Sequence, residues 1–309
     1  MSKKILFFSM MVSQIFFIGE SDAQRIAGPE TKEIIVKAGE VYQGVEFPEG
    51  TILRVVIQNN GVSSVVLSQD FKMSGHLIKK GTPLEIQGKD LFRISPADGQ
   101  KINDMEFAGE ADSIQFRNDG SVENIFLSKP KIIQGVRWAA NNWIEFHPNS
   151  KVANGTLEGD QAVGGLNLRE GTQLSFYPSG KIKGAKLAKE STWQGYIIKG
   201  EAEFNPLNTS DVNFWPNGKL QKAILAREVN QQSYYCGEGG ISFFESGQLY
   251  SCVFSRAKKV IFNPWPEQGG HEQLIEPGDG VFFNEQGVVI GLAGKDGSVS
   301  GILVSPPEL

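Results

Sequence analysis

The stretch FYPSGKIKGAKL, residues 176–187, decides the fold, because two similar stretches occur in the same chain. FHPNSKVANGTL begins at Phe146, and FWPNGKLQKAIL begins at Phe214. In each copy an aromatic pair or an aromatic residue with His precedes a short turn, and alternating apolar residues follow it. Turns rich in Pro, Asn and Gly between alternating segments are typical of β-hairpins, since Gly and Asn adopt positive φ at little steric cost. The recurrence therefore predicts a tandem array of hairpins.

Glycines extend this pattern along the chain with a period of about thirty residues. We expect about eight units, starting near residues 44, 75, 105, 135, 165, 195, 233 and 270. Apolar residues alternate between the turns, as half-buried strands require. The predicted inward residues are Leu53, Val55, Leu84, Ile86, Ile114, Phe116, Val122, Leu127, Ile144, Phe146, Val152, Leu157, Leu174, Phe176, Ile182, Leu187, Leu220, Leu225, Val281 and Phe283, with Phe47, Ile78, Trp138, Leu168, Ile198 and Cys236 three residues after the unit starts. Each unit has too few of them for a core of its own, so neighbouring units must stack.

We predict an all-β fold in which the hairpins stack into an elongated antiparallel sheet. A parallel β-solenoid fits the same period if each unit holds three short strands and the Gly turns form its corners. An odd number of strands reverses successive units in a simple meander, which favours the solenoid. The turns PSGK and PNGK favour the antiparallel sheet, because parallel pairing involves no tight reversal.

Residues 1–23 are expected to form a secretory signal peptide. Two lysines precede an apolar run from Ile5 to Gly19, and small residues surround the expected cleavage site after Ala23. The run is too short for a comfortable membrane span. We therefore expect a single β-repeat domain over residues 24–309, with no transmembrane segment in the mature chain, exported to the periplasm or outside the cell.

Charge and cysteine content exclude further classes. The chain has 30 Lys and Arg against 35 Asp and Glu, and the basic residues are scattered, so no footprint for a nucleic acid is present. The two cysteines, Cys236 and Cys252, flank one predicted hairpin. In an oxidising compartment they form a disulfide if the strand register brings them together; otherwise they are two buried thiols.

No catalytic, metal-binding or cofactor-binding motif of the HExxH, GxSxG, P-loop or CxxC kind occurs. His76 and His271 share one position of the repeat but lie about two hundred residues apart, so a joint metal site is not expected. The sequence departs from its period at two insertions, residues 201–210 and 256–270. Insertions in repeat proteins often gather on the binding face, and an enzyme site would be sought there.

The hairpin NGKL flanked by aromatic residues resembles the bacterial variant of the MORN repeat. Matching stretches run over residues 116–122, 146–152, 176–182, 214–220 and 243–249. The resemblance implies an elongated sheet of stacked hairpins and a role in interaction, including contact with lipid headgroups. It implies no catalytic residue.

One residue beyond the recurring inward Phe stand His147, Tyr177, Trp215 and Phe244, in consecutive units. Strand alternation predicts that they face away from the core and form an aromatic ladder with one rung per unit. Such a ladder suits a ligand that lies flat on it. It also stabilises stacked hairpins by cross-strand contact. Replacing Tyr177 and Trp215 with Ser separates the two interpretations, because a binding surface loses its ligand and a structural ladder loses thermal stability.

These observations predict an exported, non-catalytic repeat protein that acts as a binding or structural module at the cell envelope or outside the cell. Its expected partner is an envelope component, whether a glycan, a protein or a lipid headgroup. One alternative is a membrane-associated MORN-like protein that contacts headgroups. The other is an enzyme whose site lies near the two insertions.

Overall fold

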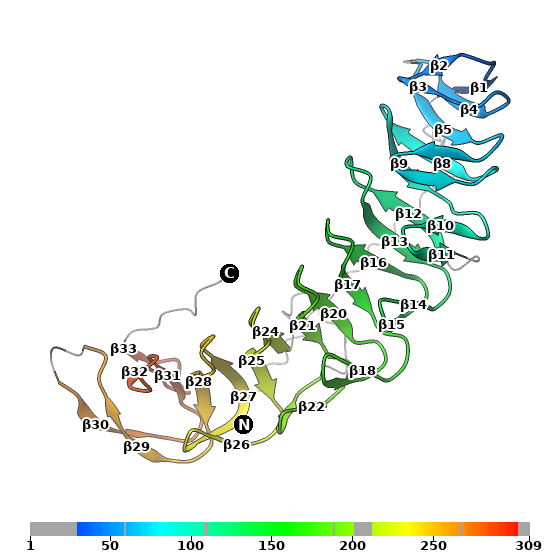
Figure 1. Ribbon diagram of the computed structural model, residues 1–309. Coiled ribbons are helices and arrows are strands. Elements are labelled where there is room, and N and C mark those ends of the chain that lie inside the picture. Colours follow the sequence, from blue (N-terminus) through cyan, green and yellow to red (C-terminus); the bar gives the residue numbers. More distant parts are fainter. Residues whose placement is uncertain are drawn as a thin grey trace, which may run out of the picture.

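The computed structural model describes residues 30–58, 60–107, 111–187, 189–200, 212–265, 267 and 269–301. These residues form one antiparallel array of strands that curves along the molecule, and the strands follow one another in chain order from β1 to β33 (Figure 1). The expected signal peptide, residues 1–23, and the insertion at residues 201–210 lie outside the described residues.

The backbone of the array is a meander of main strands, each paired with the one before it and the one after it. In order they are β1 (Thr31–Ile35), β4 (Ile52–Val56), β5 (Val62–Val66), β8 (Pro83–Gln87), β9 (Asp90–Ile94), β12 (Ala111–Phe116), β13 (Val122–Leu127), β16 (Asn142–Phe146), β17 (Val152–Thr156), β20 (Gln173–Phe176), β21 (Ile182–Lys186), β24 (Val212–Phe214), β25 (Leu220–Leu225), β27 (Tyr234–Phe243), β28 (Leu249–Phe254), β31 (Gly280–Phe283), β32 (Val289–Ala293) and β33 (Val299–Gly301). Every pairing between consecutive main strands is antiparallel. The predicted stacked hairpin sheet is confirmed, and the parallel coil is not what forms.

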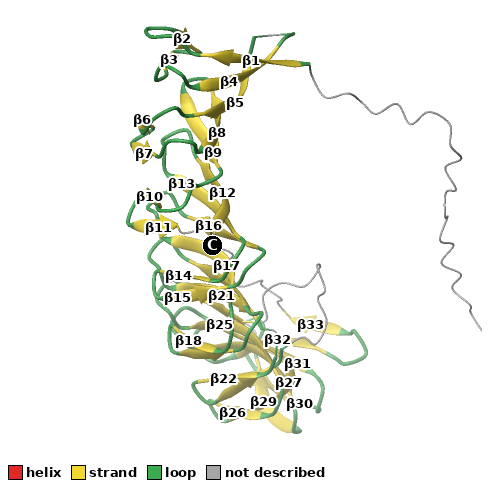
Figure 2. Ribbon diagram, turned by 90° about the vertical axis from the view of Figure 1, so that its right-hand side faces the viewer, coloured by secondary structure: helices red, strands yellow, loops and turns green. Residues whose placement is uncertain are grey.

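Short side hairpins connect the main hairpins and lie in a row beside the main strands (Figure 2). They are β2 (Val41–Tyr42) with β3 (Val45–Glu46), β6 (Phe71–Met73) with β7 (His76–Ile78), β10 (Gln100–Ile102) with β11 (Met105–Phe107), β14 (Lys131–Ile133) with β15 (Val136–Trp138), β18 (Gln161–Val163) with β19 (Leu166–Leu168), β22 (Ser191–Trp193) with β23 (Tyr196–Ile198), β26 (Val229–Gln231) with the start of β27, and the longer β29 (Lys258–Phe262) with β30 (His271–Ile275). A side hairpin and the main hairpin after it make one unit of four strands. The solenoid interpretation assumed three strands per unit, and that number was wrong. With an even number of strands, every unit runs in the same direction.

The turns of the side hairpins explain why one strand per unit was missed. In the turn between β14 and β15, Gln134 and Gly135 have φ of 52° and 80°. Two successive positive φ values are the signature of the type I′ turn that matches the twist of paired strands. The glycine that marks a unit start thus lies inside the side hairpin, and a short strand precedes it.

The core lies between the main sheet and the row of side hairpins. Every predicted inward residue is buried except Phe176, which is half-buried. Trp138 of the side hairpin is fully buried, and its Nε1 donates a hydrogen bond to the carbonyl oxygen of Ile133, 3.2 Å away. The missed short strand adds Met73, Ile102, Ile133, Val163 and Trp193 to the core. Both rows of hairpins therefore contribute apolar residues to one continuous interior.

Cys236 on β27 and Cys252 on β28 are joined by a disulfide, with their Cα atoms 5.6 Å apart. Both side chains are buried. Among the residues that the structure describes, none belongs to a helix with the length and apolar character needed to cross a membrane.

Candidate functional site

The predicted ladder residues, His147, Tyr177, Trp215 and Phe244, begin the tight turns of four consecutive main hairpins. Trp215 is only 2% exposed, and the other three are half-buried. Trp215 is therefore covered by neighbouring residues, although it does not belong to the continuous hydrophobic core. These residues lie at the boundary between neighbouring units.

Three of the four side chains direct a ring or hydroxyl atom to the next unit. The partner in each case is the backbone carbonyl of the recurring inward Phe: His147 Nε2 to Phe176 at 2.9 Å, Tyr177 OH to Phe214 at 2.8 Å and Trp215 Nε1 to Phe243 at 3.1 Å. Burial, with a smaller effect of the Glu245 charge, raises the pKa of Tyr177, so its hydroxyl stays protonated and able to donate. Phe244 instead packs edge-on against Tyr250, with ring centroids 5.1 Å apart. A ligand-binding role for these four residues stays a prediction.

Lysines from the same turns form a second connection between units. Each ammonium donates to a turn carbonyl of the next unit: Lys151 to Ser179 at 2.5 Å, Lys181 to Asn217 at 3.2 Å and Lys219 to Ser246 at 2.6 Å. All three bonds are exposed. They place one positive charge per unit along the turns of the main hairpins.

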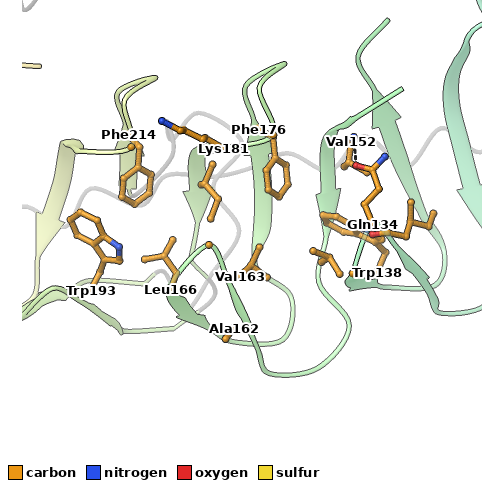
Figure 3. A pocket seen from close by; sticks show the side chains of 17 residues that line it. Gln134, Trp138, Val152, Ala162, Val163, Leu166, Phe176, Lys181, Trp193 and Phe214 are labelled. Atoms are coloured by element: carbon orange, nitrogen blue, oxygen red, sulfur yellow. Dashed lines mark hydrogen bonds between the residues drawn. The ribbon is translucent and has the colours of Figure 1, made fainter. Parts of the chain in front are cut away.

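Below these turns the two rows of hairpins enclose a cavity of about 590 Å³. Its lining is aromatic and aliphatic: Ile133, Val136, Trp138, Val152, Ala162, Val163, Leu166, Phe176, Ile182, Trp193 and Phe214, with Gln134, Lys181 and the glycines 135, 164, 180 and 218. In Figure 3, Phe176 and Phe214 point into it from the main hairpins, and Trp138, Val163, Leu166 and Trp193 lie opposite on the side hairpins. A hollow of about 410 Å³ in the next unit shares Trp193 and Gly218 with the cavity. We call the two together the aromatic groove.

One side chain crosses the space between the two rows of hairpins at one end of the groove. Gln134, in the turn of the β14–β15 side hairpin, donates from Nε2 to the carbonyl oxygen of Ser150 at 2.7 Å. Its Oε1 accepts from the amide of Val152 at 3.2 Å. Gln134 thus latches the side hairpin to the main hairpin of its own unit.

This hydrogen-bonded latch is missing in the two units that follow. In the next unit the position of Gln134 is taken by Gly164, which has no side chain to reach the main hairpin. Gln194 follows one unit later and makes no hydrogen bond to the amide of Leu220 among the described residues. The latch returns in the unit after that, where Gln232 accepts from the amide of Leu249 at 3.2 Å. Two open units therefore lie between two latched ones.

Sequence reasoning missed this site because the side chain that crosses between the rows is absent at Gly164 and makes no such contact at Gln194. The pair Gly164–Gly165 was the available signal, because the neighbouring units have Gln at the first position. Its meaning becomes clear only once Gln134 is seen to reach across to the main hairpin.

The remaining candidates do not converge. Nε2 of His76 lies 2.7 Å from the carbonyl oxygen of Gly120, whereas His271 packs against Phe262 in the last side hairpin. No group of three or more His, Cys, Asp or Glu side chains that could hold a metal occurs in the described part of the chain. Of the two insertions, the described part of residues 256–270 forms β29 and the turn after it.

Comparison with known proteins is limited to one short segment. Residues 169–189 match the model of the MORN repeat variant family, and they comprise the main hairpin β20–β21 that supplies Phe176, Lys181 and Ile182 to the groove. No curated protein matches the chain. The family is generally non-catalytic, which is consistent with a repeat-type binding or structural module. Residues 169–189 are thus similar to the MORN repeat variant, and the many hairpins in a long antiparallel sheet fit a MORN-variant repeat protein.

Proposed function

We propose that this protein is an exported, non-catalytic binding module that holds an anionic amphiphile, with the acyl chain in the aromatic groove and the head group at the lysine-bearing turns. The observation that carries the proposal is the pair of open units between the latches at Gln134 and Gln232. A purely structural array gains nothing from an unfilled cavity with an apolar lining between its hairpins.

The lining of the groove favours an apolar chain. Ligand cavities in proteins are typically about 300–1,000 Å³ and mostly apolar, and the main cavity of about 590 Å³ fits that class. Trp193 from a side hairpin and Phe214 from a main hairpin pack edge-on, with ring centroids 5.1 Å apart. Each methylene removed from water into such a site contributes about 0.8 kcal/mol.

The rim favours an anionic head group. Lys181 lines the cavity, and Lys151 and Lys219 occupy the same position in the neighbouring units. An ammonium has three N–H donors. Each of these lysines uses one donor on a turn carbonyl, so the others are available to a carboxylate or phosphate.

Two observations support export. Residues 1–23 have the layout of a signal peptide, with lysines before an apolar run and small residues after it. The Cys236–Cys252 bond suits an oxidising compartment, where disulfides persist. An exported protein with an acyl-chain groove belongs at the cell envelope, where amphiphiles are abundant.

The test introduces a glutamine at position 164, so that the first open unit can form the same hydrogen bonds as Gln134. Gly164 has φ of 57°, close to the 52° of Gln134, so Gln is compatible with the backbone there. A Cβ at Gly164 would lie 2.8 Å from Cδ1 of Ile182, whereas Val152 occupies the equivalent place beside Gln134. The double variant G164Q/I182V therefore copies the latched unit, and I182V alone is the matched control.

Binding is measured with cis-parinaric acid, a fatty acid whose fluorescence rises in apolar surroundings, on the full chain. We expect wild type and I182V to bind it and G164Q/I182V to bind at least about tenfold more weakly, which corresponds to about 1.4 kcal/mol. Equal binding by all three proteins would place the fatty acid elsewhere and refute the groove. An absence of binding to wild type, with capture of an apolar peptide instead, would replace the amphiphile with a peptide.

A further inference from the structure

The outward face of the main sheet, on the side away from the side hairpins, carries a second hollow. It measures about 320 Å³ and crosses four adjacent main strands, β16, β17, β20 and β21. Its lining residues are Trp143, Asn154, Gly155, Thr156, Gln173, Leu174, Ser175, Gly184 and Lys186. None of them lines the aromatic groove, so the two sites are separate.

Trp143 is the wall of this hollow. Trp143 is 43% exposed, whereas Trp138, Trp193 and Trp215 are buried; Trp265, in the turn after β29, is also exposed. Phe126 on the neighbouring strand packs against it at an interplanar angle of 63°, with ring centroids 5.2 Å apart. Trp143 thus lies between Phe126 and a floor that includes the small residues Gly155, Ser175 and Gly184.

Polar side chains follow the floor across the strands. The pairing register places them at one height of the sheet, in the order Gln115, Asn124, Glu145, Asn154 and Ser175. Asn124 donates to Gln115 at 3.2 Å, and Asn154 donates to Glu145 at 2.5 Å. These bonds orient the planar amide and carboxylate groups and leave further donor and acceptor positions on each group.

We propose that this hollow binds a neutral β-linked oligosaccharide that lies across the strands. A pyranose ring with equatorial substituents has an apolar C–H face and an edge of hydroxyl groups. The C–H face packs against an aromatic ring such as Trp143, and the hydroxyl groups exchange hydrogen bonds with Asn154, Gln173 and Ser175. The row of polar residues continues over neighbouring strands, about 4.8 Å apart, so successive sugars meet similar groups.

Other ligand classes fit less well. The floor is polar, which disfavours an acyl chain, because its amide groups would lose their hydrogen bonds to water. A nucleic acid needs several cations, and Lys186 is the one basic residue that lines this hollow. A neutral, hydroxyl-rich ligand matches both the mostly uncharged polar lining and the one aromatic residue, Trp143, at its side.

The experiment uses isothermal titration of the full chain with cellohexaose and with chitohexaose. The test variants are W143A and Q173A, and the matched control is W265A, because Trp265 is also exposed, at 53%, but lies in the turn after β29. We expect wild type and W265A to bind at least one of the two sugars with equal affinity. W143A should bind about tenfold more weakly and Q173A several-fold more weakly.

Gln173 is an exposed residue, so Q173A tests the site even if W143A disturbs the sheet around Phe126. Failure of both sugars to bind wild type would overturn the proposal. So would wild-type affinity in both W143A and Q173A, or equal losses in W143A and W265A. None of these outcomes bears on the fatty-acid groove, which has its own variants.

Discussion

The hydroxyl of Tyr177 donates a hydrogen bond to the carbonyl oxygen of Phe214, 2.8 Å away in the next unit. His147 and Trp215 make the equivalent contact in the units on either side. Successive main hairpins are thus joined by side chains at their turns as well as by the strand ladder. The ladder that the sequence suggested as a binding surface has a structural task in at least three of its rungs.

Removing one rung should lower stability. Y177F deletes the hydroxyl and leaves the Phe214 carbonyl without this donor, so the free energy of unfolding should fall by about 0.5–1.5 kcal/mol. W215S removes a buried indole and should cost about 3–5 kcal/mol. Urea denaturation followed by circular dichroism checks both values. Unchanged midpoints in both variants would restore the interpretation of the ladder as a ligand surface only.

Lys181 should contribute through the charge of the ligand. K181Q removes the ammonium at the rim of the groove but keeps a hydrogen-bonding side chain. Affinity for a fatty acid should fall about fivefold, as for an exposed ion pair of about 1 kcal/mol, and affinity for the fatty alcohol of equal length should not change. The difference should shrink with added salt. Equal losses for acid and alcohol would show that Lys181 acts by packing and not by charge.

The disulfide should stabilise the C-terminal third of the array. It closes a loop across a sequence separation of 16 residues, for which the chain-entropy model gives about 3 kcal/mol. Reduction with dithiothreitol should therefore lower the denaturation midpoint of wild type, and the C236A/C252A variant should not respond to the reductant. A wild-type midpoint that is insensitive to reductant would mean that the two thiols are unpaired in solution.

Asp160 makes part of the stability dependent on pH. The backbone amide of Glu170 donates to its carboxylate at 2.9 Å and Arg169 donates at 2.7 Å, and these two contacts lower the pKa of Asp160 below its ordinary 3.8. A lowered folded-state pKa stabilises the protein above pH 3.8, and this contribution is lost as the pH falls through the folded-state value. The difference in melting temperature between wild type and D160N should be full at neutral pH and should vanish in acid. A difference that persists in acid would assign the effect to packing.

The sequence predicted the main hairpins well because their signals are local. Phe146 and Val152 stand at fixed distances from a turn, and both are buried as expected. The first strand of most side hairpins was missed because it is only two or three residues long, too short to show a period. The site was harder still. Gln134 bonds to the main hairpin and Gly164 has no side chain to do so, a difference that shows only when the two hairpins are seen together. The surroundings of Trp143 depend on a strand register that is shifted by bulges.

The most direct measurement locates the bound chain itself. A fatty acid with a photoactivatable diazirine on its acyl chain is cross-linked to the wild-type protein, and the modified peptides are identified by mass spectrometry. An occupied groove predicts adducts within residues 133–138, 162–166, 176–182 and at Trp193 and Phe214, and their loss in G164Q/I182V. Adducts spread over the outward face of the sheet, or unchanged in the latched variant, would contradict a ligand-binding groove.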